Sequence, residues 1–196
     1  GTGSGVVRTP GALLLLLGAA LTLAGADWPQ FRGAGSTGVA ADDPRLPVEW
    51  STTKNIAWRV EVPGKGWSSP VVGGGRIYLT SVMTAKPQEP VKKGLYFGGN
   101  RETPPTDEHR WLVLCYDFST GKLLWQREVH RAVPDFSRHL KNSFASETPV
   151  YDSATKTLYA YFGNLGVFAF SESGNKVWEK RFEPVRTRYG WGTAAS

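Results

Sequence analysis

The strongest constraint on the fold of this chain is a short segment that occurs twice. The first copy, LCYDFSTGKLLWQREV, spans residues 114–129, and the second copy, VFAFSESGNKVWEK, spans residues 167–180. In each copy, two runs of strand-forming residues flank a short polar turn that contains glycine, and a tryptophan follows in the second run. Turns of this kind join antiparallel strands. The repeat therefore predicts the same strand–turn–strand unit at two places in the chain.

Each copy lies inside a longer repeat of four short predicted strands. The first repeat contains SSPVV, RIYLTS, WLVLCYD and LLWQREV, and the second contains SETPVYD, ATKTLYAYF, GVFAFSE and VWEKRF. Trp125 and Trp178 are 53 residues apart, near the period of about 40 to 50 residues that is typical of propeller blades. The 23 glycines and 13 prolines separate short runs rich in Val, Tyr, Phe and Trp, which favours strands. We therefore predict an all-β chain of four-stranded antiparallel β-propeller blades.

The turn residues have a structural role in this prediction. Asp117 can accept hydrogen bonds from backbone N–H groups ahead of it, Thr120 can add a hydroxyl bond, and Gly121 can adopt a positive φ. The second copy keeps the glycine and the tryptophan but has Ser171 in place of the aspartate. We expect the tryptophan rings to pack between neighbouring blades. The predicted blade-docking residues are Asp117, Thr120, Gly121, Trp125, Gly174 and Trp178.

The order of these residues resembles that of a known family. With Cys115 in the alanine position, residues 115–125 match A-x-D-x-x-T-G-K-x-x-W, the tryptophan-docking pattern of pyrroloquinoline-quinone-like (PQQ-like) propellers. The chain is also similar to exported bacterial members of unassigned role in DWPQFRG, KNIAWRVEVPGKGWSSPVV, HLKNSFASETPV and TRYGWGTAAS. The resemblance implies the quinoprotein alcohol dehydrogenase-like β-propeller fold. It does not decide the function, because the superfamily includes both quinoprotein dehydrogenases and the non-catalytic outer-membrane assembly factor BamB.

The predicted organisation is that of the N-terminal part of a larger ring. NIAWRVEV alternates apolar and polar residues and would be the outer strand of a blade that the other end of the chain completes, so that no sheet edge stays open. In DWPQFR, Trp28 and Phe31 are expected to anchor a strap on the core. The predicted units are a signal peptide at 1–26, a strap and loop at 27–54, a ring-closing outer strand at 55–62, a first blade at 63–129 with an insertion at 83–110, a second blade at 130–183 with a leading loop, and the start of a third blade at 184–196.

The N-terminus has the features of a cleavable export signal. Arg8 precedes an apolar stretch at 13–23, and small residues at 24–26 offer a cleavage point. The stretch is shorter than the about 20 residues that span a bilayer, so we expect no stable membrane anchor after cleavage; a retained anchor is the alternative. The expected location is the periplasm or the outside of the cell. The sole cysteine, Cys115, is expected to be a small buried residue, and an internal disulfide is excluded.

Cationic loops are predicted to gather at one end of the blades. Antiparallel strands reverse at every turn, so the second-to-third strand connections and the blade-to-blade connections share one end. Lys and Arg outnumber Asp and Glu there, and the formal net charge of +6 becomes +5 without Arg8. Such loops could bind an anionic small molecule, a glycan or a protein, or they could simply be solvated. The candidate ligand residues are Arg101, Arg110, Arg138, Lys141, Arg186, Arg188, Tyr189 and Trp191.

Two classes of function follow. The leading hypothesis is an exported, non-catalytic scaffold that binds a ligand or protein through this basic face. The alternative implied by the resemblance is an alcohol or sugar dehydrogenase that uses PQQ and calcium. That class often has a vicinal cysteine pair, which a single cysteine cannot form, and no residue here matches its catalytic, quinone or calcium positions. Another propeller enzyme, such as a hydrolase, is a further possibility. We predict no metal site, since the histidines form no close pair, and no nucleic-acid binding.

Overall fold

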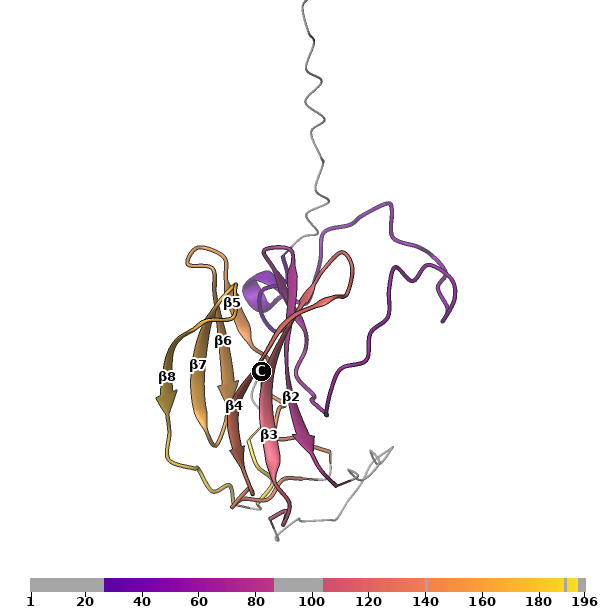
Figure 1. Cartoon of the computed structure of the whole chain (residues 1–196). Helices are drawn as coiled ribbons and strands as arrows, with labels where there is room; N and C mark the ends of the chain where they lie inside the picture. Colours follow the sequence, from indigo (N-terminus) through magenta and orange to yellow (C-terminus); the bar gives the residue numbers. More distant parts are fainter. Residues whose placement is uncertain (1–26, 87–103, 140, 189, 194–196) are drawn as a thin grey trace, which may run out of the picture.

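The fold consists of two four-stranded antiparallel sheets that lie face to face (Figure 1). The computed structural model describes residues 27–86, 104–139, 141–188 and 190–193. The first sheet contains β1 (Val71–Gly73), β2 (Arg76–Thr84), β3 (His109–Asp117) and β4 (Leu123–Ala132), and the second contains β5 (Val150–Asp152), β6 (Thr157–Phe162), β7 (Gly166–Ser171) and β8 (Lys176–Arg181). In both sheets the strand order follows the sequence. The prediction of an all-β chain of four-stranded blades is confirmed.

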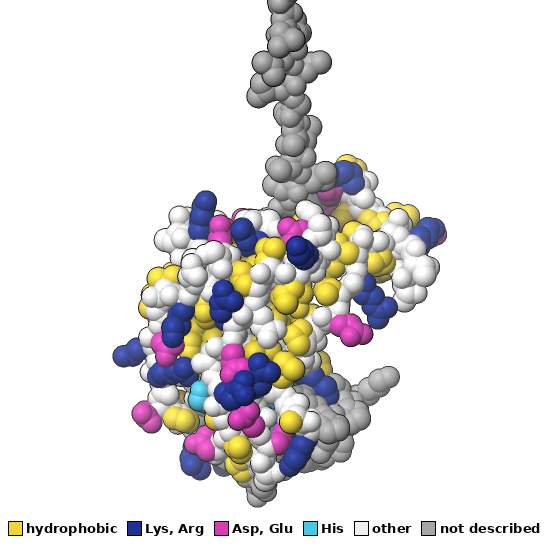
Figure 2. Space-filling model, viewed as in Figure 1, with side chains coloured by type: hydrophobic (Ala, Val, Ile, Leu, Met, Phe, Trp, Pro, Cys, Tyr) yellow, Lys and Arg dark blue, Asp and Glu magenta, His cyan; other side chains and the backbone are white. Residues whose placement is uncertain are grey.

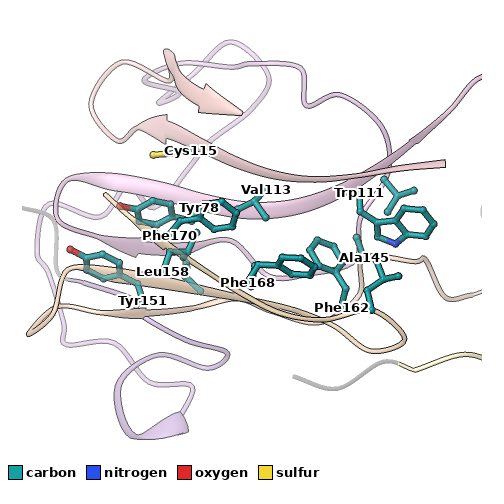
Figure 3. Packing of buried hydrophobic residues seen from close by; sticks show 14 of the residues in the cluster. Tyr78, Trp111, Val113, Cys115, Ala145, Tyr151, Leu158, Phe162, Phe168 and Phe170 are labelled. Carbon is teal, nitrogen blue, oxygen red and sulfur yellow. The ribbon is translucent and has the colours of Figure 1, made fainter. Parts of the chain in front are cut away.

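The main hydrophobic core lies between the two sheets. In β6, Leu158, Ala160 and Phe162 are buried and alternate with more exposed residues, as expected when one face of a strand meets another sheet. Rings from both sheets point toward one another, with Tyr78 stacked on Tyr151 at a centroid distance of 5.4 Å (Figure 3). Cys115 is buried in the same cluster, and burial raises the pKa of its thiol to about 12. The cysteine is therefore a packing residue, as predicted.

The strap at residues 28–29 joins the first strands of the two sheets, β1 and β5. Trp28 exchanges both backbone hydrogen bonds with Val72 of β1, each 2.8 Å long, and the Pro29 carbonyl accepts one from Tyr151 N in β5 at 2.8 Å. One short segment is therefore hydrogen-bonded to the first strand of each sheet. The expectation that Phe31 anchors this strap is wrong: its side chain is 40% exposed, because the chain turns outward into the loop that carries the 3-10 turn η1 (Ala34–Ser36).

The observed strands differ from one predicted range and leave another untested. β2 continues to Thr84 and β3 begins at His109, so the connection between them is shorter than the predicted insertion at 83–110. Residues 55–62 form no strand, and Ile56, Val60 and Val62 are exposed; the ring-closing strand needs a partner sheet, which the described residues do not supply, and so it stays a prediction. The predicted signal peptide at 1–26 lies outside the described residues.

The connections between strands gather at two ends of the blades (Figure 1). We call the end with the turns after Gly73, Asp117, Asp152 and Ser171 the turn end, which lies toward the top of Figure 1. We call the end with the connections after Thr84, Ala132, Phe162 and Arg181 the loop end, which lies toward the bottom. The docking motif therefore lies at the turn end, and the candidate ligand residues that the structure describes lie at the loop end.

Candidate functional site

The turn after β3 has the hydrogen bonds that its sequence predicts. One carboxylate oxygen of Asp117 accepts from the backbone N–H of Thr120 at 2.8 Å and from its hydroxyl at 2.7 Å. These bonds lower the pKa of the Asp117 carboxyl. Gly121 follows with a φ of 70° and donates its N–H to the Asp117 carbonyl at 2.9 Å. Aspartate, threonine and glycine together fix the corner of the hairpin.

Each corner receives a tryptophan from the segment before it. Trp125 of β4 donates its indole N–H to the Glu172 carbonyl at 2.8 Å, and a Cβ on Gly174 would lie 2.7 Å from its ring. Trp58 repeats this arrangement, with a 3.0 Å bond to the Phe118 carbonyl and 2.5 Å between its ring and a Cβ on Gly121. The glycines are therefore required twice, for a positive φ and for close contact with an indole ring.

Trp178 does not dock in this way among the described residues. Trp178 is 45% exposed, and its ring lies beside that of Tyr159, within its own sheet, at a centroid distance of 5.8 Å. All of β8 is exposed. The docking role predicted for Trp178 thus stays a prediction, because the corner that would receive it is not among the residues described.

Sequence reasoning missed Arg127, a second docking residue. Its Nε donates to the Gly174 carbonyl at 2.6 Å, and its Cζ lies 5.7 Å from the ring centroid of Trp125. The only sign of this role in the sequence is the position of Arg127 two residues after Trp125. In the other repeat, the equivalent position after Trp178 is Lys180.

The candidate ligand residues differ in whether they are described and in whether a carboxylate already neutralises them. Arg101 and Tyr189 lie outside the described residues. Arg110 is paired with Glu128 at 2.6 Å, and Arg131 also binds Glu128 at 2.7 Å; Arg131 and Arg110 lower the pKa of that carboxyl to about 2. Figure 2 accordingly shows cationic and anionic side chains interspersed over the visible face instead of one basic patch. Arg110 is therefore a poor candidate for binding an anion.

Arg138 also has a structural task. Its guanidinium donates to the Asn142 carbonyl at 2.9 Å and lies 5.6 Å from the ring centroid of Phe144. Lys141 is exposed and donates its backbone N–H to His139 Nδ1 at 3.1 Å. These two cations lie on the connection between the blades, which they help to shape.

The connections on either side of the second blade are joined by hydrogen bonds. Ser137 Oγ donates to the Gly190 carbonyl at 2.8 Å, and the backbone N–H of His139 donates to the Trp191 carbonyl at 2.9 Å. Asn142 Nδ2 adds bonds of 3.1 Å to two carbonyls of the same segment. Between the connections lies a pocket of ≈ 400 Å³, which we call the inter-loop pocket; its lining includes Asp135, Phe136, Asn164, Val185, Arg186 and Arg188. Two of the predicted ligand residues thus line one cavity with fixed walls.

A comparison with protein-family models shows the family of the chain. Residues 26–189 match the family model described as the outer membrane protein assembly factor BamB, a PQQ-repeat family. The chain belongs to this family. The match confirms the PQQ-like resemblance, and a BamB-like family of this kind implies that the two sheets are propeller blades, consistent with a fragment of a ring. No curated protein sequence matches the chain.

Within this BamB-like chain, Glu147 is a buried carboxylate that sequence reasoning missed. Its side chain is 2% exposed, and Oε1 accepts from Gly163 N at 3.1 Å and from Thr193 Oγ1 at 2.9 Å. Burial raises the pKa of Glu147. Only a comparison of the repeats gives a signal, because SETPV places Glu147 where SSPVV has Ser68. The carboxylate attaches the segment after β8 to the second blade.

The described residues do not fit a PQQ and calcium site. No group of three or more His, Cys, Asp or Glu side chains within the described ranges could hold a metal ion, whereas calcium takes six to eight oxygen ligands. Cys115 has Leu114 and Tyr116 as its neighbours and therefore forms no vicinal cysteine pair. In the same ranges, no helix is long and apolar enough to cross a bilayer.

Proposed function

We propose that this BamB-like protein is an exported, non-catalytic β-propeller scaffold that binds an anionic partner at its loop end. The observation that carries the proposal is the position of Arg186 and Arg188 on the inter-loop pocket, whose walls are joined by hydrogen bonds. Cations held near one another on a fixed surface act together on an anionic partner. The family also supports a scaffold, since BamB is by its description an assembly factor for outer-membrane proteins.

Export is supported by the N-terminal sequence. Arg8, the apolar stretch at 13–23 and the small residues at 24–26 form a signal-like segment, and the family match begins at residue 26. We expect the mature chain to begin at Asp27 and to be found in the periplasm or the medium. Intact-mass measurement of the protein from each cell fraction tests this. Uncleaved protein in the cytoplasm would contradict it.

Binding at the loop end is tested with heparin, a sulfated polyanion, on a column. Reversing Arg186→Glu and Arg188→Glu together should lower the salt concentration at which the protein elutes. The matched control reverses Lys122→Glu and Lys156→Glu, which are exposed at the turn end and change the net charge equally. An equal loss in both double variants would show that only net charge matters. Binding should also weaken toward about 1 M salt, where the screening length falls to roughly 3 Å.

The non-catalytic part of the proposal has its own test. We expect no dye-linked oxidation of alcohols or sugars by the protein supplied with PQQ and calcium. Oxidation that depends on both additions would replace the scaffold proposal with the dehydrogenase alternative.

A further inference from the structure

The inter-loop pocket combines four kinds of chemical group. Arg186 and Arg188 supply positive charge, Asp135 supplies a carboxylate acceptor, and Asn164 supplies an amide. Phe136 and Val185 add apolar surface, and Phe136 is held edge-on against Phe144 at a centroid distance of 5.2 Å. Small-molecule sites commonly combine apolar walls with a few fixed polar groups in this way.

The Asn164 amide and the Arg186 guanidinium can both donate hydrogen bonds to a ligand. Asn164 is 6% exposed, and its Oδ1 accepts from Val185 N at 3.1 Å. This bond leaves Nδ2 as the donor that Asn164 can offer in the pocket, since no described residue accepts from it. The exposed Arg186 makes no hydrogen bond or ion pair with a described residue. A carboxylate could therefore bind the Arg186 guanidinium through two parallel hydrogen bonds without displacing a protein partner.

Asp135 narrows the class of anion. Its carboxylate is exposed on the same pocket, and it opposes a phosphate or sulfate, which offers mainly acceptors and negative charge. A ligand with hydroxyl groups can instead donate hydrogen bonds to Asp135 while its own carboxylate binds the arginines. A volume of ≈ 400 Å³ is near the lower end of the range of about 300–1,000 Å³ for ligand pockets, which suits one or two sugar rings.

We propose that the inter-loop pocket binds an acidic sugar of the hexuronate class. The sugar carboxylate binds Arg186 with support from Arg188, its hydroxyls donate to Asp135 and accept from Asn164, and its C–H face lies on Phe136. The inference rests on the proposed anion-binding role of the loop end and gives that role a substrate class and a site.

The experiment measures binding of D-glucuronate to the whole chain by saturation-transfer NMR, with D-glucose and inorganic phosphate as comparisons. We expect glucuronate to bind at least about tenfold more tightly than glucose and phosphate not to displace it. Arg186→Met, which keeps the aliphatic stem, should weaken glucuronate binding about tenfold and leave that of glucose unchanged. Asn164→Asp, which keeps the acceptor for Val185 N, should also weaken it. Lys156→Met at the turn end is the control and should have no effect.

Three outcomes would overturn the proposal: equal binding of glucose and glucuronate, displacement of glucuronate by phosphate at equal concentration, or unchanged glucuronate binding in the Arg186→Met variant. These outcomes are separable from failure of the proposed function. If the arginine reversals weaken retention on heparin but glucuronate does not bind, the basic face binds anions and the acidic-sugar inference is wrong.

Discussion

Trp125 and Trp178 occupy the same place in two copies of one motif, yet their surroundings differ. Each follows its turn glycine by four residues and lies in the last strand of its blade. Trp125 is 8% exposed and donates its indole N–H to the next blade, whereas Trp178 is 45% exposed and its ring lies beside that of Tyr159 in its own sheet. The motif alone therefore does not bury the ring. Burial requires the glycine corner of a neighbouring blade.

The comparison shows that docking requires the glycine corner of a blade that follows the tryptophan in the chain. Trp58 contacts the corner at Gly121, and Trp125 contacts the corner at Gly174, so each tryptophan meets the corner that follows it in the chain. Within a propeller family, Trp178 is then expected to meet a further corner. The exposed β8 edge, with Val177 58% exposed beside Trp178, is the surface such a blade would cover.

The largest predicted effect is the difference in stability between the variants in which Trp125 or Trp178 is replaced by alanine. Trp125→Ala should lower the free energy of unfolding by about 3 to 5 kcal/mol, because it leaves a cavity between the sheets and removes the bond to Glu172. Trp178→Ala should cost less than about 0.5 kcal/mol, as is usual at exposed sites. Urea melts of the folded protein measure both. Equal costs would show that the corner does not decide the burial energy.

This contrast marks how far the sequence could predict the fold. The four-strand repeat and the turn at Asp117 follow from residue spacing, because local turn chemistry and strand alternation determine them. The docking of Trp125 is predicted by the motif, but it also needs the corner at Gly174 in the next blade. The exposure of Phe31 could not be predicted, since it depends on which surface is close enough to cover the ring, and the strand at 55–62 stays a prediction for the same reason. At the loop end the sequence identified Arg186 and Arg188 as ligand candidates. It did not reveal that Glu128 neutralises Arg110, because the two residues meet only across β3 and β4.

Glycine substitutions separate the two reasons for glycine at a corner. Gly174 has a φ of 79°, and an added Cβ would lie 2.7 Å from the Trp125 ring; Gly75 has a φ of 71° with no atom within 4 Å of an added Cβ. Gly75→Ala should therefore cost about 1 to 2 kcal/mol from backbone conformation alone. Gly174→Ala should cost about 2 to 4 kcal/mol, because the ring must also move. Thermal or urea unfolding gives the difference. If Gly75→Ala cost as much as Gly174→Ala, the ring contact would have no measurable energy.

Arg127 provides a smaller contrast at the same interface. Arg127→Met keeps the aliphatic stem but loses the bond to the Gly174 carbonyl and the contact with the Trp125 ring, so it should cost about 1 to 2 kcal/mol. Lys180→Met changes the equivalent position after Trp178, which is exposed, and should stay within about 0.5 kcal/mol of zero. A cost at Lys180 matching that at Arg127 would contradict the view that this position acts only across a formed interface.

The smallest expected effect is a change in how the stability of the fold depends on pH when Glu147 is replaced. This residue attaches the segment after β8 to the second blade. Burial raises the folded-state pKa of Glu147 above its usual value, so the folded state holds more protons than the unfolded state between the two values. This group therefore stabilises the fold at low pH, and its contribution falls as pH rises through the folded pKa.

Glu147→Gln keeps an acceptor for Gly163 N and Thr193 Oγ1 and removes the titration. Asp117 and Glu128, whose pKa values are lowered, oppose the trend in both proteins and cancel in the difference. The stability of the Gln variant relative to the natural chain should thus rise from pH 4.5 to pH 7. Parallel stability curves would show that Glu147 does not titrate differently on folding.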